Sequence, residues 1–186
     1  MIQVLIFFAS VLLCACFAAI LLLIGELWRV SFWGGVPSIF STWAIVDAII
    51  SAKVLPRDGL ILDLGAGNGW TLRRMWRSGM KGPFIGYEKE WWPWIVGTVW
   101  NSVTGAPIIL KREDFLNAPI EDARGIYLFL FPSILSGLGG SIEQKAHHGI
   151  PVVSAEFAVP GWTPERTLEA KGITNKKAKV FCYRTP

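Results

Sequence analysis

The sequence has few residues of the kinds that bind metals or form redox bridges. It contains three cysteines, Cys14, Cys16 and Cys182, and two histidines, the adjacent pair His147 and His148. Two of the cysteines lie inside an apolar run, so no disulfide framework can be drawn, and a reducing compartment fits best. Two histidines supply too few ligands for a zinc site, and we expect no bound metal.

Charge is missing from the start of the chain, where no charged side chain precedes Glu26 and residues 2–24 are almost entirely apolar. At 1.5 Å per residue such a helix is roughly 35 Å long, more than the hydrocarbon core of a bilayer. A cleaved signal peptide is the alternative, but it needs a basic start and a shorter apolar stretch. We expect a transmembrane anchor at 1–27, an interfacial linker and cofactor-side loop at 28–41, and a soluble domain at 42–186.

This segment predicts a chain that crosses the lipid bilayer once, and its uncharged N-terminal end favours a domain on the cytoplasmic or matrix side. The net charge of +4 is too small, without a recognisable module, for nucleic acid to be the main partner. Basic residues nevertheless cluster, and they either face anionic lipid headgroups or form a solvated surface. The clusters are Arg73, Arg74, Arg77 and Lys81, and Lys171, Lys176, Lys177 and Lys179.

Short apolar runs alternate with helical patterns over the rest of the chain. Strands are predicted at 60–64, 83–88, 107–114, 125–131, 150–158 and 178–184. Helices are predicted at 42–54, 71–82 and 92–103, with a helix broken by glycines at 133–149. The alternation indicates an α/β fold with a mostly parallel sheet and helices on both faces.

Tryptophans gather in the third of these helices and just before it. Helix core packing accounts for at least two of them, and the others are candidates for an apolar wall beside a membrane-embedded target. They are Trp91, Trp92, Trp94 and Trp100.

The turn after the first predicted strand, in LILDLGAGNGW, carries three alternating glycines. In an open α/β sheet this turn is the favoured ligand site, and glycine lets a ligand approach the backbone. The spacing is GxGxG, whereas a dinucleotide site has GxGxxG, and Trp70 occupies the third-glycine position. Asp63 at the mouth of the turn disfavours phosphate and favours a cationic, amino-acid-like ligand. Glu88, at the end of the second strand, is placed to accept hydrogen bonds from ribose hydroxyls.

DLGAGNG followed by GYE resembles the first motif and the second-strand acid of seven-stranded, class I S-adenosylmethionine-dependent methyltransferases. The resemblance implies a compact Rossmann-like domain with S-adenosylmethionine as cofactor. REDF at 112–115 falls where that family binds adenine; alternatively, Asp63 and Asp114 only cap turns. The cofactor-binding residues it implies are Asp63, Gly65, Ala66, Gly67, Asn68, Gly69, Glu88, Asp114 and Phe115.

A narrower resemblance covers most of the chain after the apolar run. The segments that carry it are GVPS (35–38), PWIV (93–96), FPSIL (131–135) and VVSAEFAVPGW (152–162). They look like the membrane-anchored lysine N-methyltransferases of the ATP synthase c-subunit and adenine nucleotide translocase type, and like their archaeal relatives. The chain departs from that pattern at 91–92, which resembles an insertion, and at Glu156, where a basic residue is expected.

The resemblance implies methylation of a lysine in a protein at or in the membrane. Such a lysine must lose its proton before it can attack, and burial beside a cation favours the neutral amine. Phe131, Pro132 and Ser133 are the candidates for positioning it, unless they form an ordinary turn. Ser38 is implied at the methionine end of the cofactor, unless it caps the following helix. Two other functions stay open: methylation of a lipid or small hydrophobic molecule, and a non-catalytic nucleotide-binding scaffold.

Overall fold

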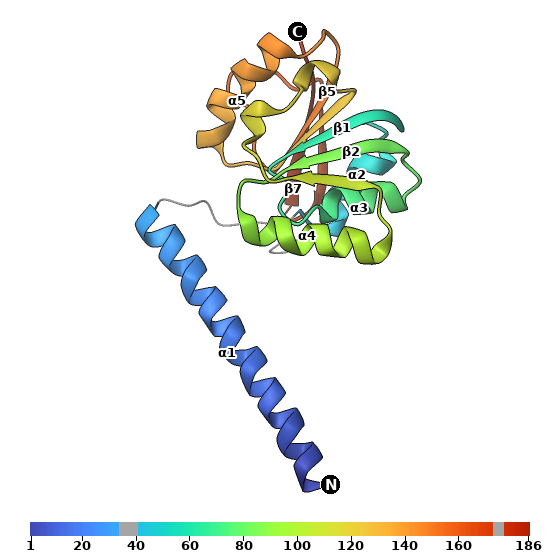
Figure 1. The fold of residues 1–186 in the computed structure, drawn as a ribbon. Coiled ribbons are helices and arrows are strands. Elements are labelled where there is room, and N and C mark those ends of the chain that lie inside the picture. Colours follow the sequence, from blue (N-terminus) through green and yellow to red (C-terminus); the bar gives the residue numbers. More distant parts are fainter. Residues whose placement is uncertain (34–40, 173–176) are drawn as a thin grey trace. The chain divides into compact units, whose positions relative to one another are not determined.

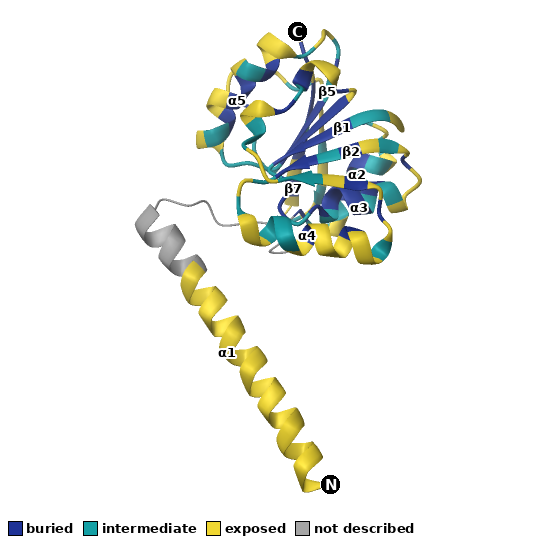
Figure 2. Ribbon diagram, viewed as in Figure 1, coloured by how far each residue is buried: buried dark blue, intermediate teal, exposed yellow. Residues whose placement is uncertain are grey.

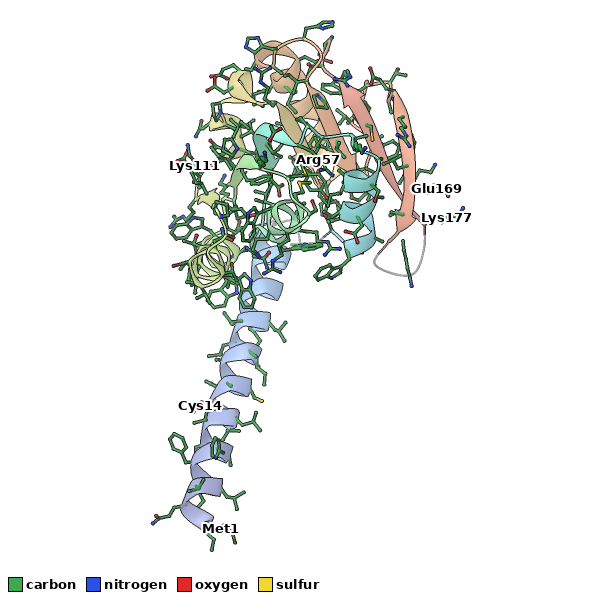
Figure 3. All side chains as sticks on the ribbon, turned by 90° about the vertical axis from the view of Figure 1, so that its right-hand side faces the viewer. Met1, Cys14, Arg57, Lys111, Glu169 and Lys177 are labelled. Atoms are coloured by element: carbon green, nitrogen blue, oxygen red, sulfur yellow. The ribbon has the colours of Figure 1, made fainter. Side chains whose placement is uncertain are left out.

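The computed structural model describes residues 1–33, 41–172 and 177–186. The chain divides into two compact units, Met1–Ile39 and Phe40–Pro186. The described residues of the first unit form one helix, α1 (Ile2–Trp33). Its Ile2–Gly25 segment is 24 residues long, exposed along its whole length, and apolar enough to cross a membrane. Its side chains, Cys14 among them, project from the helix into the surroundings (Figure 3).

The second unit is built on a seven-stranded sheet with the order β3-β2-β1-β4-β5-β7-β6. Five strands form a parallel array, and β7 runs antiparallel to both of its neighbours, β5 and β6. The strands are β1 (Asp58–Leu64), β2 (Gly82–Tyr87), β3 (Ile108–Lys111), β4 (Gly125–Leu128), β5 (Pro151–Ala155), β6 (Arg166–Lys171) and β7 (Lys177–Arg184).

Helices cover both faces of this sheet (Figure 1). The helices are α2 (Trp43–Ser51), α3 (Trp70–Arg77), α4 (Trp91–Thr104) and α5 (Pro132–Lys145), with short 3₁₀ turns η1 (Phe115–Asn117) and η2 (Ile120–Asp122). One core cluster joins the sheet to α2 and α3 through residues such as Ile49 and Met75. A second joins the opposite face to η2 and α5 through residues such as Ile120 and Leu138. Figure 2 shows the central strands as the most deeply buried part.

The expected fold class is confirmed, but the structure corrects three details. Helix α1 continues through Trp33, so residues 28–33 are helical and the helix does not end at the expected anchor boundary; the interfacial linker at 28–41 stays a prediction. The first glycine pair of the sequence comes only after Trp33, and nothing before it breaks the helix. Helix α5 is also unbroken, because Leu135, Leu138 and Ile142 are buried and packing outweighs the low helix propensity of its glycines.

The third correction is β6, which the sequence reasoning missed. Its segment RTLEAK has three charged residues among six and is largely exposed, so no apolar run marks it. It forms an edge strand through its antiparallel ladder with β7. The Nζ of Lys177 donates to Glu169 at 2.7 Å across that ladder, and Figure 3 shows the two side chains together. The carbonyl of Lys171 also accepts a hydrogen bond from the Thr42 hydroxyl at 2.7 Å.

Candidate cofactor and substrate site

The glycine turn between β1 and α3 is fastened to the neighbouring strand. The amides of Gly65 and Ala66 both donate to the carbonyl of Tyr87, at 3.0 and 2.9 Å. Gly65 has φ +99° and Gly67 has φ +54°, values that side-chain-bearing residues rarely adopt. A Cβ built on Gly65 would also lie 2.8 Å from Leu130 Cδ2. The turn therefore needs glycine for its conformation as well as for its space.

Glu88 holds the middle of this turn with its side chain. Its Oε2 accepts from the Gly67 amide at 2.8 Å, and its Oε1 accepts from the Glu90 amide at 2.8 Å. A carboxylate oxygen can accept more than one hydrogen bond, so each oxygen keeps capacity for a ligand hydroxyl. Burial raises the pKa of Glu88, and the two backbone N–H groups oppose that rise. The expected ribose acceptor thus lies at the glycine turn with acceptor sites to spare.

Asn68, by contrast, forms its hydrogen bonds with other residues of the chain. Its Oδ1 accepts from the amide of Trp70 at 3.1 Å, at the start of α3. Its backbone carbonyl accepts from Arg73 Nη1 at 2.7 Å. Helix α4 packs tightly beneath, because a Cβ on Gly97 would come within 2.4 Å of that carbonyl oxygen. The side chain of Asn68 shapes the turn, and a direct contact with the cofactor stays a prediction.

Asp63 lies at the end of β1 and is only 2% exposed. Burial, followed by the nearby charge of Glu88, raises the pKa of Asp63 to about 8. At neutral pH the side chain is therefore mostly protonated when no ligand is present. Without a ligand it does not carry the negative charge expected from the sequence. A cation placed beside it would favour the carboxylate again. Asp63 is thus a candidate partner for a cationic ligand, with proton release coupled to binding.

Tyr127 is a neighbour of Asp63 that the sequence reasoning missed. The two residues face each other in the β1–β4 register. The hydroxyl of Tyr127 is hydrogen-bonded to that of Ser41, and both residues are buried. Burial raises the pKa of Tyr127 well above its ordinary value, so it stays neutral. The bond attaches the segment before α2 to the centre of the sheet.

Asp114 and Phe115 follow β3, whose carboxyl end lies beside that of β2 in the register Tyr87–Lys111. The Oδ1 of Asp114 accepts from the Leu116 amide at 3.1 Å and caps η1. Its Oδ2 lies 3.4 Å from Lys89 Nζ. Phe115 packs, half-buried, against the core of that face. Turn capping by Asp114 is thus present in the structure, and its adenine contact stays a prediction.

Pro132 and Ser133 form the exposed first turn of α5. The carbonyl of Phe131 accepts from the amides of Ile134 and Leu135 at 2.9 and 3.1 Å. The carbonyl of Ser133 accepts from the Ser136 hydroxyl at 3.1 Å. The carbonyls of Phe131 and Ser133 are therefore engaged within the helix, which leaves the Ser133 hydroxyl as the group that can position a target amine. Ser38, the remaining predicted site residue, lies outside the described residues.

An aromatic cluster at the ends of β4 and β5 is a second feature that sequence reasoning missed. The ring of Phe157 lies 6.5 Å from that of Phe129 and 5.4 Å from that of Phe131, centroid to centroid. The adjoining Glu156 has φ +64°, a conformation that costs energy for a residue with a Cβ and often marks a functional site. The signal in the sequence was that Phe129 and Phe131 follow β4, while Glu156 and Phe157 follow its neighbour β5.

Among the described residues there is no group of three or more histidine, cysteine, aspartate or glutamate side chains that could hold a metal ion. The groups that are present suit a different ligand. A turn with three glycines, a carboxylate with free acceptor capacity and a buried acid that a cation would ionise fit a ribose and a cationic amino-acid group.

Comparison with known proteins decides the family. The model of the ANTKMT methyltransferase domain matches residues 63–166, which begin at Asp63 and include the glycine turn, Glu88 and Asp114. The chain belongs to the ANTKMT methyltransferase domain family. The resemblance to this family seen in the sequence is thereby confirmed.

Two curated relatives of this ANTKMT-type chain carry names that specify a reaction. The adenine nucleotide translocase lysine N-methyltransferase of Mus musculus is 31% identical over 58% of this chain and 48% of its own length. The chain thus spans about half the length of that relative. A protein-lysine N-methyltransferase of Saccharolobus islandicus is 24% identical over 80% of this chain and 92% of its own length.

A solved structure similar to the ANTKMT-type chain is an RNA methyltransferase from Salinibacter ruber in complex with S-adenosyl-L-homocysteine. It is 25% identical, with a TM-score of 0.69 over 81% of this chain and 94% of its own. The class I methyltransferase fold expected from the sequence is confirmed by this likeness. S-adenosyl-L-homocysteine is the demethylated form of the expected cofactor.

Proposed function

We propose that this chain is an S-adenosylmethionine-dependent protein-lysine N-methyltransferase that is anchored in a membrane by α1 and acts on a protein at or in that membrane. The observation that carries the proposal is the Glu88 carboxylate hydrogen-bonded to the Gly67 amide at 2.8 Å within the part of the chain that matches the ANTKMT domain. The names of the mouse and archaeal relatives support lysine as the acceptor.

When bound, S-adenosylmethionine supplies a methyl group on a sulfonium, and transfer depends mainly on alignment and exclusion of water. Glu88 accepts hydrogen bonds from the ribose hydroxyls, and Asp63 faces the cationic amino-acid end in its ionised form. Ser38 is proposed beside that same end. Asp114 and Phe115 take the adenine edge and ring.

On the acceptor side, the chain has to hold a lysine amine in its neutral form. The rings of Phe129, Phe131 and Phe157 cluster at the carboxyl ends of β4 and β5, and an apolar wall disfavours an ammonium. The exposed hydroxyl of Ser133, in the turn that begins at Pro132, is the candidate for positioning the amine. No side-chain nucleophile is required, because the acceptor amine attacks directly.

Anchoring rests on the Ile2–Gly25 segment, 24 residues long, which as a helix spans roughly 36 Å. That exceeds the ~30 Å hydrocarbon core of a bilayer and allows a tilted single pass. The uncharged start of the segment favours the cytoplasmic or matrix side for the domain.

The experiment incubates the full chain with membranes and a methyl-labelled donor, then separates protein, lipid and RNA. We expect label in protein, on the ε-amine of lysine, and none from the Glu88→Ala variant. A matched control is Glu143→Gln, an exposed carboxylate on α5 outside the proposed site, which should keep full activity. Label in lipid alone would make the chain a lipid methyltransferase, and label in RNA would give it the activity named for the Salinibacter structure.

Absence of label from all three fractions, together with absence of cofactor binding by calorimetry, would leave the scaffold function. Cofactor binding without transfer would instead indicate that the target protein is missing from the membranes used, and membranes from the native source would then be the substrate.

A further inference from the structure

Helix α4 presents a stripe of apolar side chains to solvent. Trp92, Val96, Val99 and Val103 follow one another at helical spacing and are 44%, 37%, 58% and 79% exposed. Trp100, 54% exposed, borders the stripe one turn beyond Val96. Figure 2 shows α4 as largely exposed. A contiguous apolar face of this kind on a folded domain marks a site of interaction.

Of the tryptophans in this helix, one is held by a hydrogen bond inside the fold and two are not. Trp94 is half-buried, and its indole Nε1 donates to the carbonyl of Leu110 at 2.9 Å. Within the described part of the chain, the indole N–H groups of Trp92 and Trp100 have no hydrogen-bond acceptor. Core packing therefore accounts for Trp94 and leaves Trp92 and Trp100 unexplained.

Beside this stripe lies a pocket of about 420 Å³ between α2, α3 and α4. Three arginines and three tryptophans form most of its lining: Arg73, Arg74, Arg77, Trp43, Trp70 and Trp100. Aromatic rings with a polar N–H beside cationic guanidinium groups are the composition found where proteins meet the headgroup region of a membrane.

The positive charge of the pocket is only partly compensated. Arg74 forms a two-point ion pair with Asp47, at 2.8 and 2.9 Å, and lies over the ring of Trp43. Arg73 is 6% exposed and donates to neutral acceptors, the Asn68 carbonyl and Asn101 Oδ1. No carboxylate of the described residues pairs with Arg73 or with Arg77. Two guanidinium groups in one pocket without a counterion favour an anion there.

We propose that the α4 stripe and this arginine–tryptophan pocket form a docking surface for the membrane interface, in which the pocket receives the phosphate of an anionic phospholipid headgroup. Guanidinium groups bind phosphate in two-point geometry. Tryptophan rings are stable at headgroup depth, and the valines reach the acyl boundary, as in interfacial amphipathic helices. The surface requires a nearby bilayer, which an apolar segment such as Ile2–Gly25 would provide, and it does not depend on the identity of the methyl acceptor.

The test places an environment-sensitive fluorophore on Val103→Cys in the full chain, with Cys14→Ala and Cys16→Ala and one copy per nanodisc. Cys182 is buried and does not compete for the label. The matched control carries the fluorophore at Gln144→Cys, an exposed position on α5. With anionic phospholipid we expect a blue shift at residue 103 and none at residue 144.

The Arg77→Gln variant tests the phosphate. One basic group near an anionic surface contributes about fivefold to the docking equilibrium, so this variant should need a higher fraction of anionic lipid by about that factor. Lys81→Gln removes the same charge outside the pocket and should leave the midpoint unchanged. Both replaced side chains are exposed, so the fold should persist, and thermal unfolding checks that it does.

Three results would overturn the proposal. The fluorophore at residue 103 could report water in anionic nanodiscs, as it does at residue 144. It could report an apolar environment in neutral and anionic nanodiscs alike, which would indicate packing against protein. Equal effects of Arg77→Gln and Lys81→Gln would indicate general charge attraction without a headgroup site.

Discussion

The carboxylate of Glu88 accepts a hydrogen bond from the amide of Gly67 at 2.8 Å. The two residues lie 21 positions apart in the chain and on different β–α connections, and β1 and β2 run side by side to bring them together. The bond fixes the side chain that is proposed to hold the ribose before any ligand arrives. Preorganisation of this kind lowers the entropy lost on binding.

Asp63 should make the folded domain less stable as the pH rises. Its pKa is about 8 in the folded chain, against an ordinary value of 3.8, so the folded state binds the proton more tightly than the unfolded state. Stability is then lost between about pH 4 and pH 8 and is constant above that. We expect Asp63→Asn to gain up to about 4 kcal/mol in unfolding free energy relative to wild type from pH 5 to pH 8. Urea unfolding at both pH values, without cofactor, measures this.

The same residue should make cofactor binding depend on pH. If the cofactor cation requires ionised Asp63, affinity rises up to about tenfold per pH unit below pH 8 and levels off above it. Calorimetry in two buffers of different ionisation enthalpy should detect close to one proton released at pH 7. The Asp63→Asn variant should bind the cofactor weakly, and its affinity should not depend on pH in this way. If affinity rose with pH equally in both proteins, a group other than Asp63 would be responsible for the titration.

Gly65→Ala should destabilise the domain by about 1–3 kcal/mol, because alanine is strained at positive φ. The new Cβ would also meet the side chain of Leu130. Adding Leu130→Ala to Gly65→Ala should relieve that contact but not the backbone strain, so the double variant should not regain the stability of Leu130→Ala alone. Chemical unfolding of the three variants gives the comparison. If the losses of unfolding free energy of the two single variants simply added in the double variant, the contact with Leu130 would contribute nothing to the destabilisation.

Trp94 and Trp92 should respond differently to the same replacement. Trp94→Phe removes the donor to the Leu110 carbonyl, which should cost about 1–2 kcal/mol of unfolding free energy. Trp92→Phe should change stability by less than about 0.5 kcal/mol, because the side chain is exposed and none of the described residues accepts a hydrogen bond from it. Equal losses in urea unfolding would place Trp92 in the packed structure and remove it from the proposed docking surface.

Much of the fold could be predicted because its signals are local. The apolar runs of the central strands and the glycine turn each appear in a few consecutive residues, and the α/β order follows from their alternation. Strand β6 could not be found in this way, because an exposed edge strand with alternating charges depends on its partner β7 for its conformation. Helix α5 was misjudged for the related reason that burial of one face holds its glycines in helical geometry.

The residues of the site likewise include some with local sequence signals and some that depend on contacts formed after folding. Residue types and spacing pointed to Gly65, Gly67 and Glu88, since the glycine turn and the acid that follows the second strand are each recognisable in a few consecutive residues. The protonation of Asp63 and the hydrogen bonds that Asn68 accepts from Trp70 and Arg73 depend on what surrounds these residues after folding, and no short stretch of sequence carries that information. The cluster of Phe129, Phe131 and Phe157 joins the ends of two strands that are about 25 residues apart in the sequence.

The most direct test of the central claim compares S-adenosyl-L-homocysteine with its analogue lacking both ribose hydroxyls, by calorimetry on the full chain and on Glu88→Ala. Hydrogen bonds to a charged acceptor contribute about 1.5–3 kcal/mol each, so wild type should bind the analogue at least tenfold more weakly than the parent compound. Glu88→Ala should bind the two almost equally. An undiminished preference in Glu88→Ala would show that another group holds the ribose and would contradict the site described for this chain.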